Sequence, residues 1–269
     1  MTFFETLTAA TNDFIQRGFV SQEQLERWMA ALDKAARASL MPEHQMREQM
    51  QQAFRGVYRR LVENGGIAQF HPGVQRFTIQ QVLPKLRAEL DRRILASAQL
   101  IKLNREAAIQ KTLQRFSGWS TSIPAGGTKT ADRVEEKDKV RKSLAQLPFE
   151  ERRVLIDQTH KLTSALNETL ATGGGAIAAK WFSHWRQAGY DYREDHKERD
   201  GVVYAIRGNW ALEKGLMKPG AAGFVDDITK PGEEVFCRCS YRYIYNLRSL
   251  PEDMLTAKGR DELKTTRIA

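Results

Sequence analysis

The residues best suited to chemistry lie in the last third of the chain and are one histidine and two cysteines. His196 stands in the run Arg193-Glu194-Asp195-His196, and Cys237 and Cys239 are separated by a single residue. An imidazole nitrogen and two thiolates are donors that zinc prefers, and a Cys-x-Cys pair can bring both sulfurs to one ion. The sequence therefore predicts His196, Cys237 and Cys239 as a candidate metal-binding set, with zinc as the candidate cofactor. The candidates for a fourth ligand are a water molecule and the carboxylates of Asp195, Glu233 and Glu234.

Three interpretations of this set stay open from the residues alone. In the first, a structural zinc holds together a small module that is too rich in loops to build a large core. In the second, His196 hydrogen-bonds a turn, and the two thiols are buried as small apolar groups. In the third, His196 acts with Asp195 and Asp200 in a metal-dependent nuclease.

The overall composition favours acidic partners and a reducing compartment. The 269 residues carry a formal net charge of +9, and a basic excess favours binding to nucleic acid through the release of counter-ions. A disulfide between Cys237 and Cys239 would be strained, so we expect free thiols and a cytosolic origin. We find no secretory signal and no apolar run long enough for a membrane span, so no membrane partner is expected.

The pattern of apolar residues and turn signals predicts an α+β protein. We expect an elongated, mainly helical N-terminal region and a small, loop-rich α+β C-terminal module. The expected divisions are a helical arm at 1–118, a linker at 119–130, a second helical block at 131–188, and the module with a C-terminal tail at 189–269. The linker is assigned because Ser, Thr, Gly and Pro are frequent there.

Two of these divisions carry more detailed expectations. Apolar residues from Ile79 to Phe116 recur with a period of about 3.6, which predicts one long helix with a kink or a delayed start at Pro84. In the second helical block, Pro148 is expected to begin a new helix, and Trp181 is expected to lie on a short one.

The predicted long helix also carries a row of basic residues. The candidates for contacting phosphate groups of nucleic acid are Arg87, Arg92, Arg93 and Arg105. One interpretation is a solvated face whose cations pair with carboxylates three or four positions away. The other is a face that contacts double-stranded DNA without sequence preference. Few aromatic residues interleave with these cations, so stacking of bases from a single strand is not expected on this helix.

Several motifs stand in an order that resembles a known family. They are Trp185, Arg193-x-x-His196, Asp200-Gly201, Pro231-Gly232-Glu233 and Cys237-Arg238-Cys239, over about residues 176–245. This order resembles the C-terminal domain of the phage Mu F-like minor head proteins, also called phage head morphogenesis proteins. Members of that family resemble one another through an Arg-x-x-His or Cys-x-x-Cys pair before a Leu-Asp-Gly, and a late Asn-Cys-Arg-Cys. This chain has Arg199 where the Leu is common and Phe236 where the Asn is common.

The resemblance implies a minor capsid protein of a tailed phage, with a structural rather than enzymatic role. Such a protein is present in few copies in the virion and is recruited near the portal while the head assembles in the host cytoplasm. The implied partners are the portal and other capsid proteins, with packaged double-stranded DNA as a further one, and the implied process is DNA packaging or ejection. Structural-motif roles are carried over to Arg193, Asp200, Gly201, Pro231, Gly232 and Arg238.

Two functions from other classes remain as alternatives. A nuclease-like or transferase enzyme in the C-terminal module would use His196 for turnover. A non-specific DNA-binding protein would depend on the four arginines of the long helix, and its affinity would fall steeply with salt.

Overall fold

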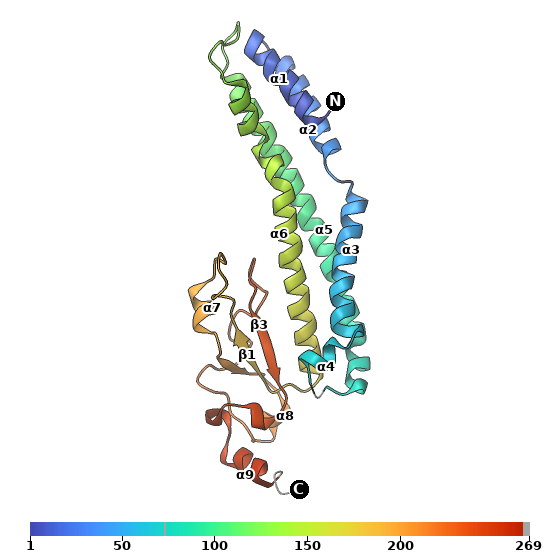
Figure 1. Cartoon of the computed structure of the whole chain (residues 1–269), viewed down its shortest axis with the longest axis vertical. Coiled ribbons are helices and arrows are strands. Elements are labelled where there is room, and N and C mark those ends of the chain that lie inside the picture. The colour runs from blue at the N-terminus through green and yellow to red at the C-terminus, as the bar shows by residue number, and fades with distance from the viewer. Residues whose placement is uncertain (73, 266–269) are drawn as a thin grey trace. The chain divides into compact units, whose positions relative to one another are not determined.

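The computed structural model describes residues 1–72 and 74–265, and it confirms the predicted α+β class (Figure 1). Helices dominate the chain up to Gly173, and a three-stranded antiparallel sheet lies in the region that follows. The last four residues of the expected C-terminal tail, 266–269, lie outside the described residues. The chain divides into two compact units, Met1–Met50 with Ala96–Val154, and Gln51–Leu95 with the chain from Leu155 onward.

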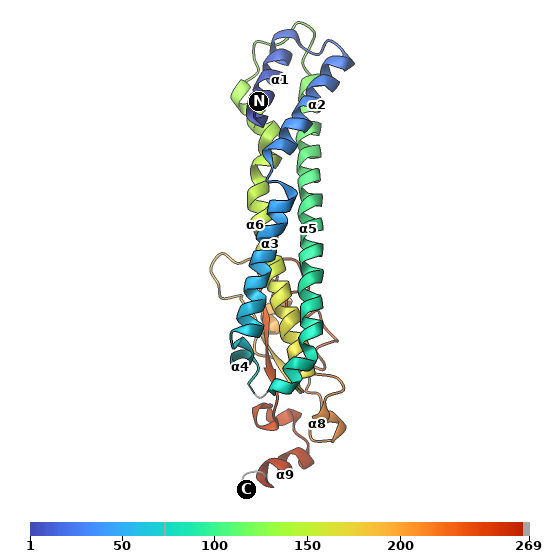
Figure 2. The ribbon, with the colours of Figure 1, turned by 90° about the vertical axis from the view of Figure 1, so that its right-hand side faces the viewer.

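The first unit is built from helices around an aromatic and aliphatic core. Its elements are α1 (Phe3–Arg17), α2 (Gln22–Ser39), the first part of α3 (Glu43–Tyr58), the later part of α5 (Arg76–Thr121) and the first part of α6 (Arg133–Gly173). Helices α1 and α2 lie side by side (Figure 2). Phe14, Leu32 and Phe116 are fully buried between these helices. The Phe14 and Phe116 rings meet edge to face with centroids 5.6 Å apart, a favourable aromatic geometry.

The segment between α5 and α6 is packed against the end of α1. Gly126 donates its N–H to the carbonyl of Arg17, and Thr128 donates to that of Ile15, both at 2.9 Å. Gly127 has a φ of +85°, and a Cβ there would lie 2.2 Å from the Ile15 oxygen, so only glycine fits. Helix α5 continues to Thr121, so the expected linker at 119–130 is helical at its start.

Of the predictions for the two longest helices, that of the long helix α5 is confirmed and the one for α6 is wrong. Helix α5 continues through Pro84, so its start is not delayed there. The expectation that Pro148 begins a new helix is wrong, because Pro148 lies inside α6. A proline costs a helix one hydrogen bond and about 3 kcal/mol. Here its ring is exposed, while Leu147 and Leu162 of the same helix are buried, so apolar packing of one face offsets that cost.

The second unit contains the sheet. Its helical elements are the later part of α3, the π-helical turn η1 (Arg59–Glu63), α4 (Gly66–Phe70), the first part of α5, the later part of α6, α7 (Glu194–Glu198), α8 (Trp210–Glu213), the 3-10 turns η2 (Leu247–Ser249) and η3 (Glu252–Met254), and α9 (Ala257–Thr265). The strands are β1 (Ala178–Phe182), β2 (Val203–Ala205) and β3 (Ser240–Ile244). Strand β1 is central, and both neighbours are antiparallel to it. In the described part of the chain, no helix is long and apolar enough to cross a bilayer.

Trp181 lies on the central strand, so the expectation of a short helix there is wrong. Residues 176–179 are all buried, so this run lacks the alternation of apolar and polar residues that distinguishes a strand from a helix. Along β1, Ala179 and Trp181 face one side of the sheet, and Lys180 and Phe182 face the other. Trp181 is fully buried in a small core with Tyr204, Cys237 and Cys239.

His71 is a buried link inside the second unit. Its Nε2 donates to the Asn167 carbonyl oxygen at 2.9 Å, and its Nδ1 accepts from the Tyr245 hydroxyl at 2.6 Å. The ring also stacks on Tyr243, with centroids 5.7 Å apart. Burial lowers the pKa of His71, because desolvation disfavours the imidazolium. A second proton on the ring would also remove the acceptor that Tyr245 uses.

We predict that this histidine makes the second unit sensitive to acid. Between about pH 7.5 and 5.5 the unfolded chain takes up protons on its histidines, whereas buried His71 resists protonation. Stability is therefore present above the ordinary histidine pKa and is lost as the pH falls below it. Chemical denaturation at several pH values should show a shallower loss of unfolding free energy in His71→Gln than in the unaltered protein. The matched control is His44→Gln, since His44 is exposed. Equal slopes for all three proteins would contradict this role of His71.

Candidate metal centre

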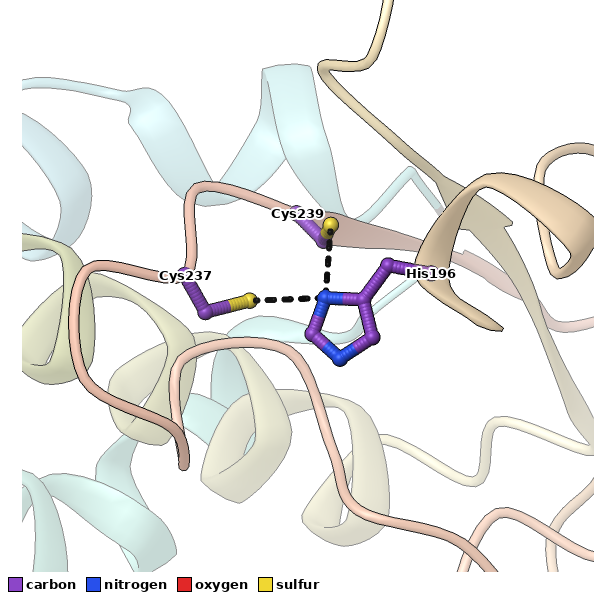
Figure 3. Close-up of side chains that lie close together, drawn as sticks. All are labelled: His196, Cys237 and Cys239. Carbon is purple, nitrogen blue, oxygen red and sulfur yellow. Dashed lines mark hydrogen bonds between the residues drawn. The ribbon is translucent and has the colours of Figure 1, made fainter. Parts of the chain in front are cut away.

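The three predicted ligands converge from segments far apart in the sequence. His196 lies on the short helix α7, Cys239 directly precedes β3, and Cys237 lies in the loop before it (Figure 3). His196 Nδ1 points between the two sulfurs, 3.7 Å from Cys237 Sγ and 3.6 Å from Cys239 Sγ. The three donor atoms lie within 4.8 Å of one another. This cluster could hold a metal ion.

The spacing of the donors matches what zinc requires. With Zn–S bonds of about 2.3 Å and a Zn–N bond of about 2.0 Å, tetrahedral angles place a sulfur and a nitrogen about 3.6 Å apart. The two measured distances from Nδ1 agree with that value. The single lone pair of Nδ1 can accept from only one thiol at a time, so the approach of both sulfurs is not explained by two simultaneous hydrogen bonds to this nitrogen.

Hydrogen bonds prepare one member of the cysteine pair to lose a proton, although burial opposes it. The hydrogen bond from the Cys239 thiol and the backbone N–H of Gly232, 3.4 Å from the Cys237 sulfur, lower the pKa of Cys237 to about 5. The same hydrogen bond from Cys239 raises the pKa of that thiol, and burial adds to the rise. One negative charge on the pair is therefore favourable, and a bound dication would favour the second.

Glu234 faces the other nitrogen of the histidine ring. Its Oε2 lies 2.9 Å from His196 Nε2 and 3.0 Å from Arg193 Nε. Both Nε2 and Oε2 are buried, although their contact is not aligned as a hydrogen bond. A carboxylate beside Nε2 favours the proton on that nitrogen and leaves the lone pair on Nδ1, toward the sulfurs. Trp181 packs edge to face against the same ring, with centroids 5.2 Å apart.

A turn and a strained residue set the position of Cys237. Gly232 is buried with a φ of +85°, and a Cβ there would lie 2.9 Å from Ser164 Oγ of α6. Phe236 has a φ of +60°, the left-handed conformation that costs a bulky residue free energy. Its N–H donates to Asp157 Oδ1 of α6 at 2.6 Å, and this bond holds the conformation in place.

The remaining motif residues fix the loops around the ligands. Arg193 begins α7 and donates to the Val235 carbonyl at 3.1 Å. Asp200 accepts from Ser183 N–H at 2.9 Å and from Trp185 Nε1–H at 3.0 Å. Gly201 turns the chain with a φ of +85°. Pro231 is buried beside Gly232, and the Arg238 N–H donates to the Tyr190 hydroxyl at 3.1 Å.

The carboxylates considered as fourth ligands or nuclease residues are engaged elsewhere. Asp195 pairs with Arg199 at 2.7 Å, and its nearer oxygen lies 3.9 Å from His196 Nε2, on the side of the ring away from the sulfurs. Glu233 accepts from the Lys230 N–H at 2.7 Å. Within the described residues, the metal-binding group joins His196 to the two cysteines and includes no carboxylate.

The four arginines predicted for nucleic acid have different surroundings. Arg92 and Arg93 both pair with Glu89, at 2.7 and 2.9 Å. Arg87 is exposed and lies over the ring of Tyr58.

Arg105 is only 8% exposed. It pairs with Glu151 at 2.5 Å and donates to the Met41 carbonyl, so it does not belong to a free basic face.

Two important residues escaped sequence analysis. Asp157 has the ordinary appearance of a helix residue followed by Lys161 at i+4, with which it pairs at 3.2 Å. Ser183 lies two residues before the motif residue Trp185 but belongs to no motif itself, and its hydroxyl accepts from the Cys239 thiol at 3.8 Å. Both act across long sequence separations, and no local pattern reports such a contact.

Comparison with known proteins adds no relative to this description. No protein-family model, curated protein or solved structure matches the chain.

We predict that Asp157 stabilises the metal-binding loop through the acceptor it offers to Phe236. Asp157→Ala removes the acceptor of the 2.6 Å hydrogen bond from the Phe236 N–H, which should lower the unfolding free energy by about 1–3 kcal/mol. Loss of any bound zinc to a chelator should also become faster.

The matched variant is Asp157→Asn, which keeps an oxygen at the same place and should lose much less of both properties. If the alanine and asparagine variants behave alike, the charge of Asp157 matters and its hydrogen bond to the loop does not. Denaturation curves and chelator kinetics on the full chain measure both quantities.

Proposed function

We propose that the chain is a non-enzymatic assembly protein of a tailed-phage head and that its C-terminal region is a docking module held together by zinc. The observation that carries this proposal is the convergence of the motif residues. His196 meets Cys237 and Cys239 about 40 positions away, Arg193 meets Val235 just before them, and Asp200 holds the loop that carries Ser183 and Trp185. Residues whose contacts fix the shape of loops suit an assembly role. The order of these residues in the sequence supports the resemblance to minor head proteins.

The metal proposal rests on the donor set. His196 Nδ1 and the sulfurs of Cys237 and Cys239 would hold the zinc ion, which joins α7 to the strand β3. Bound zinc supplies charge that keeps both thiols ionised and a crosslink between two segments with little regular structure. Glu234 orients the imidazole, and the Gly232 N–H stabilises one thiolate.

Burial favours a structural centre over a catalytic one. His196 and Cys237 are each 1% exposed, and Cys239 is 3% exposed. A substrate needs access to the metal, and this shell of protein does not offer it. The site nevertheless offers only three protein donors, and catalytic zinc sites have three protein ligands with water at the fourth position. A zinc enzyme is therefore the second candidate. A hydrolytic nuclease is therefore the alternative that the experiment must separate.

Metal analysis tests the centre itself. The protein purified from cells should contain about one zinc per chain, and Cys237→Ser, Cys239→Ser and His196→Asn should each lose it. Without zinc the second unit should unfold at lower denaturant concentration, because binding energy at such sites is folding energy. The control is His184→Asn, since His184 is exposed and outside the ligand set. Full zinc occupancy in the ligand variants would contradict the assignment.

Head assembly tests the function. The chain would be co-expressed with the portal and major capsid proteins of a tailed phage whose genome encodes it, and the resulting particles would be analysed for its presence. We expect a small number of copies per particle, and we expect His196→Asn to be excluded from particles because its docking module is unfolded. Normal incorporation of that variant, together with loss of a DNA-cleaving activity, would instead establish the nuclease. Absence of the unaltered chain from all particles would contradict an assembly role.

A further inference from the structure

The sheet presents two cations directly opposite each other. Lys180 of β1 pairs in register with Arg242 of β3, and Phe182 pairs with Ser240. These side chains lie on the face of the sheet opposite to Trp181. Like charges opposite each other on antiparallel strands are destabilising, so this arrangement needs a compensating partner.

No ion pair among the described residues compensates these two cations. Both lie over the ring of Phe182, with Arg242 Cζ 4.8 Å and Lys180 Nζ 5.8 Å from its centroid. Arg242 is exposed, and Lys180 and Phe182 are half-buried. The attraction to an aromatic ring leaves the positive charge itself in place.

The same arrangement recurs beside this pair. Arg186 lies 4.5 Å from the centroid of Trp185, and its side chain is 73% exposed. Asp200 joins the two groups, because it pairs with Arg186 at 3.3 Å, and its pKa is lowered by the Ser183 N–H first and also by Lys180. Its oxygens already accept hydrogen bonds from backbone and indole N–H groups, so one engaged carboxylate faces two cations, and among the described residues no ion pair joins it to Arg242. We call Lys180, Phe182, Trp185, Arg186 and Arg242 the Phe182 face.

This face differs from the predicted DNA-contacting row on α5. On that helix Arg92 and Arg93 share Glu89, and Arg105 is buried against Glu151. The Phe182 face instead combines available cations with aromatic rings. Cations bind the phosphates of a polyanion, and rings bind its bases by stacking. An acidic peptide would use the cations but would leave the rings without a role.

We propose that the Phe182 face binds single-stranded nucleic acid, with Lys180, Arg186 and Arg242 at phosphates and Phe182 and Trp185 against bases. This site is independent of the proposed metal centre, since none of its residues is a metal ligand. The metal-centre proposal and the assembly proposal can therefore be disproved without changing the result expected below. The nucleic-acid proposal can likewise be disproved without changing the other two.

The test is fluorescence anisotropy of a labelled oligothymidine and of a duplex of equal length, titrated with the full chain at several salt concentrations. The single strand should bind more tightly than the duplex. Lys180→Gln with Arg242→Gln should weaken it about tenfold or more and reduce the salt slope, by about 0.7 for each phosphate that the variant no longer neutralises. Phe182→Leu should weaken it at least about fivefold, because leucine cannot stack on a base.

Arg87→Gln is the matched control for Arg242→Gln alone, because Arg87 is an exposed arginine on α5 and each substitution removes one positive charge. It should leave the affinity within about twofold, which is the result expected when a defined site carries the binding. Circular dichroism and the denaturation midpoint of every variant verify that the fold is retained, and the exposed Arg242→Gln alone serves if Phe182→Leu fails to fold. The proposal is overturned by an equal loss in Arg87→Gln, by equal affinity for the duplex, or by competition from polyglutamate as effective as that from the single strand.

Discussion

The convergence of His196 Nδ1 on two sulfurs is the contact on which the C-terminal part of the second unit depends. Between β1 and β3 the described chain forms only short helices, one three-residue strand and turns. Ala205, Ala211, Leu216 and Met217 of this segment pack into an apolar core, while ordering its loops costs conformational entropy. The approach of His196 to the two sulfurs joins α7 to the start of β3. The loops that surround this contact then need only individual hydrogen bonds from Asp157, Asp200 and Arg193 to stay in place.

The polar motif residues acquire distinct physical roles in this arrangement. Glu234 sets the orientation of the imidazole, Gly232 lets the turn approach Ser164, and Asp200 orders the loop that carries Trp185. None of these needs to take part in a reaction. Their shared property is that each restrains a loop close to Cys237 and Cys239, as the proposed docking role requires.

The sequence allowed correct predictions where the local pattern and the tertiary structure favour the same conformation. The apolar period of α5 predicted a long helix, and the Cys-x-Cys pair with His196 predicted a cluster that the structure brings together. It failed where packing decides. Pro148 lies inside a helix because the buried face continues past it, and the uninterrupted apolar run before Trp181 hides a strand. Arg105 could not be told from its exposed neighbours, because its partner Glu151 comes from another helix.

The opposition of Lys180 and Arg242 has a consequence for how the protein responds to solution conditions. Two cations held side by side on neighbouring strands raise the free energy of the folded sheet, and dissolved anions lower it by occupying the space between them. Multivalent buffers such as phosphate or citrate would therefore raise the melting temperature of this sheet more than chloride at the same ionic strength. The buffer used in purification would therefore affect the measured melting temperature. It would also determine whether these cations are available to bind another polyanion.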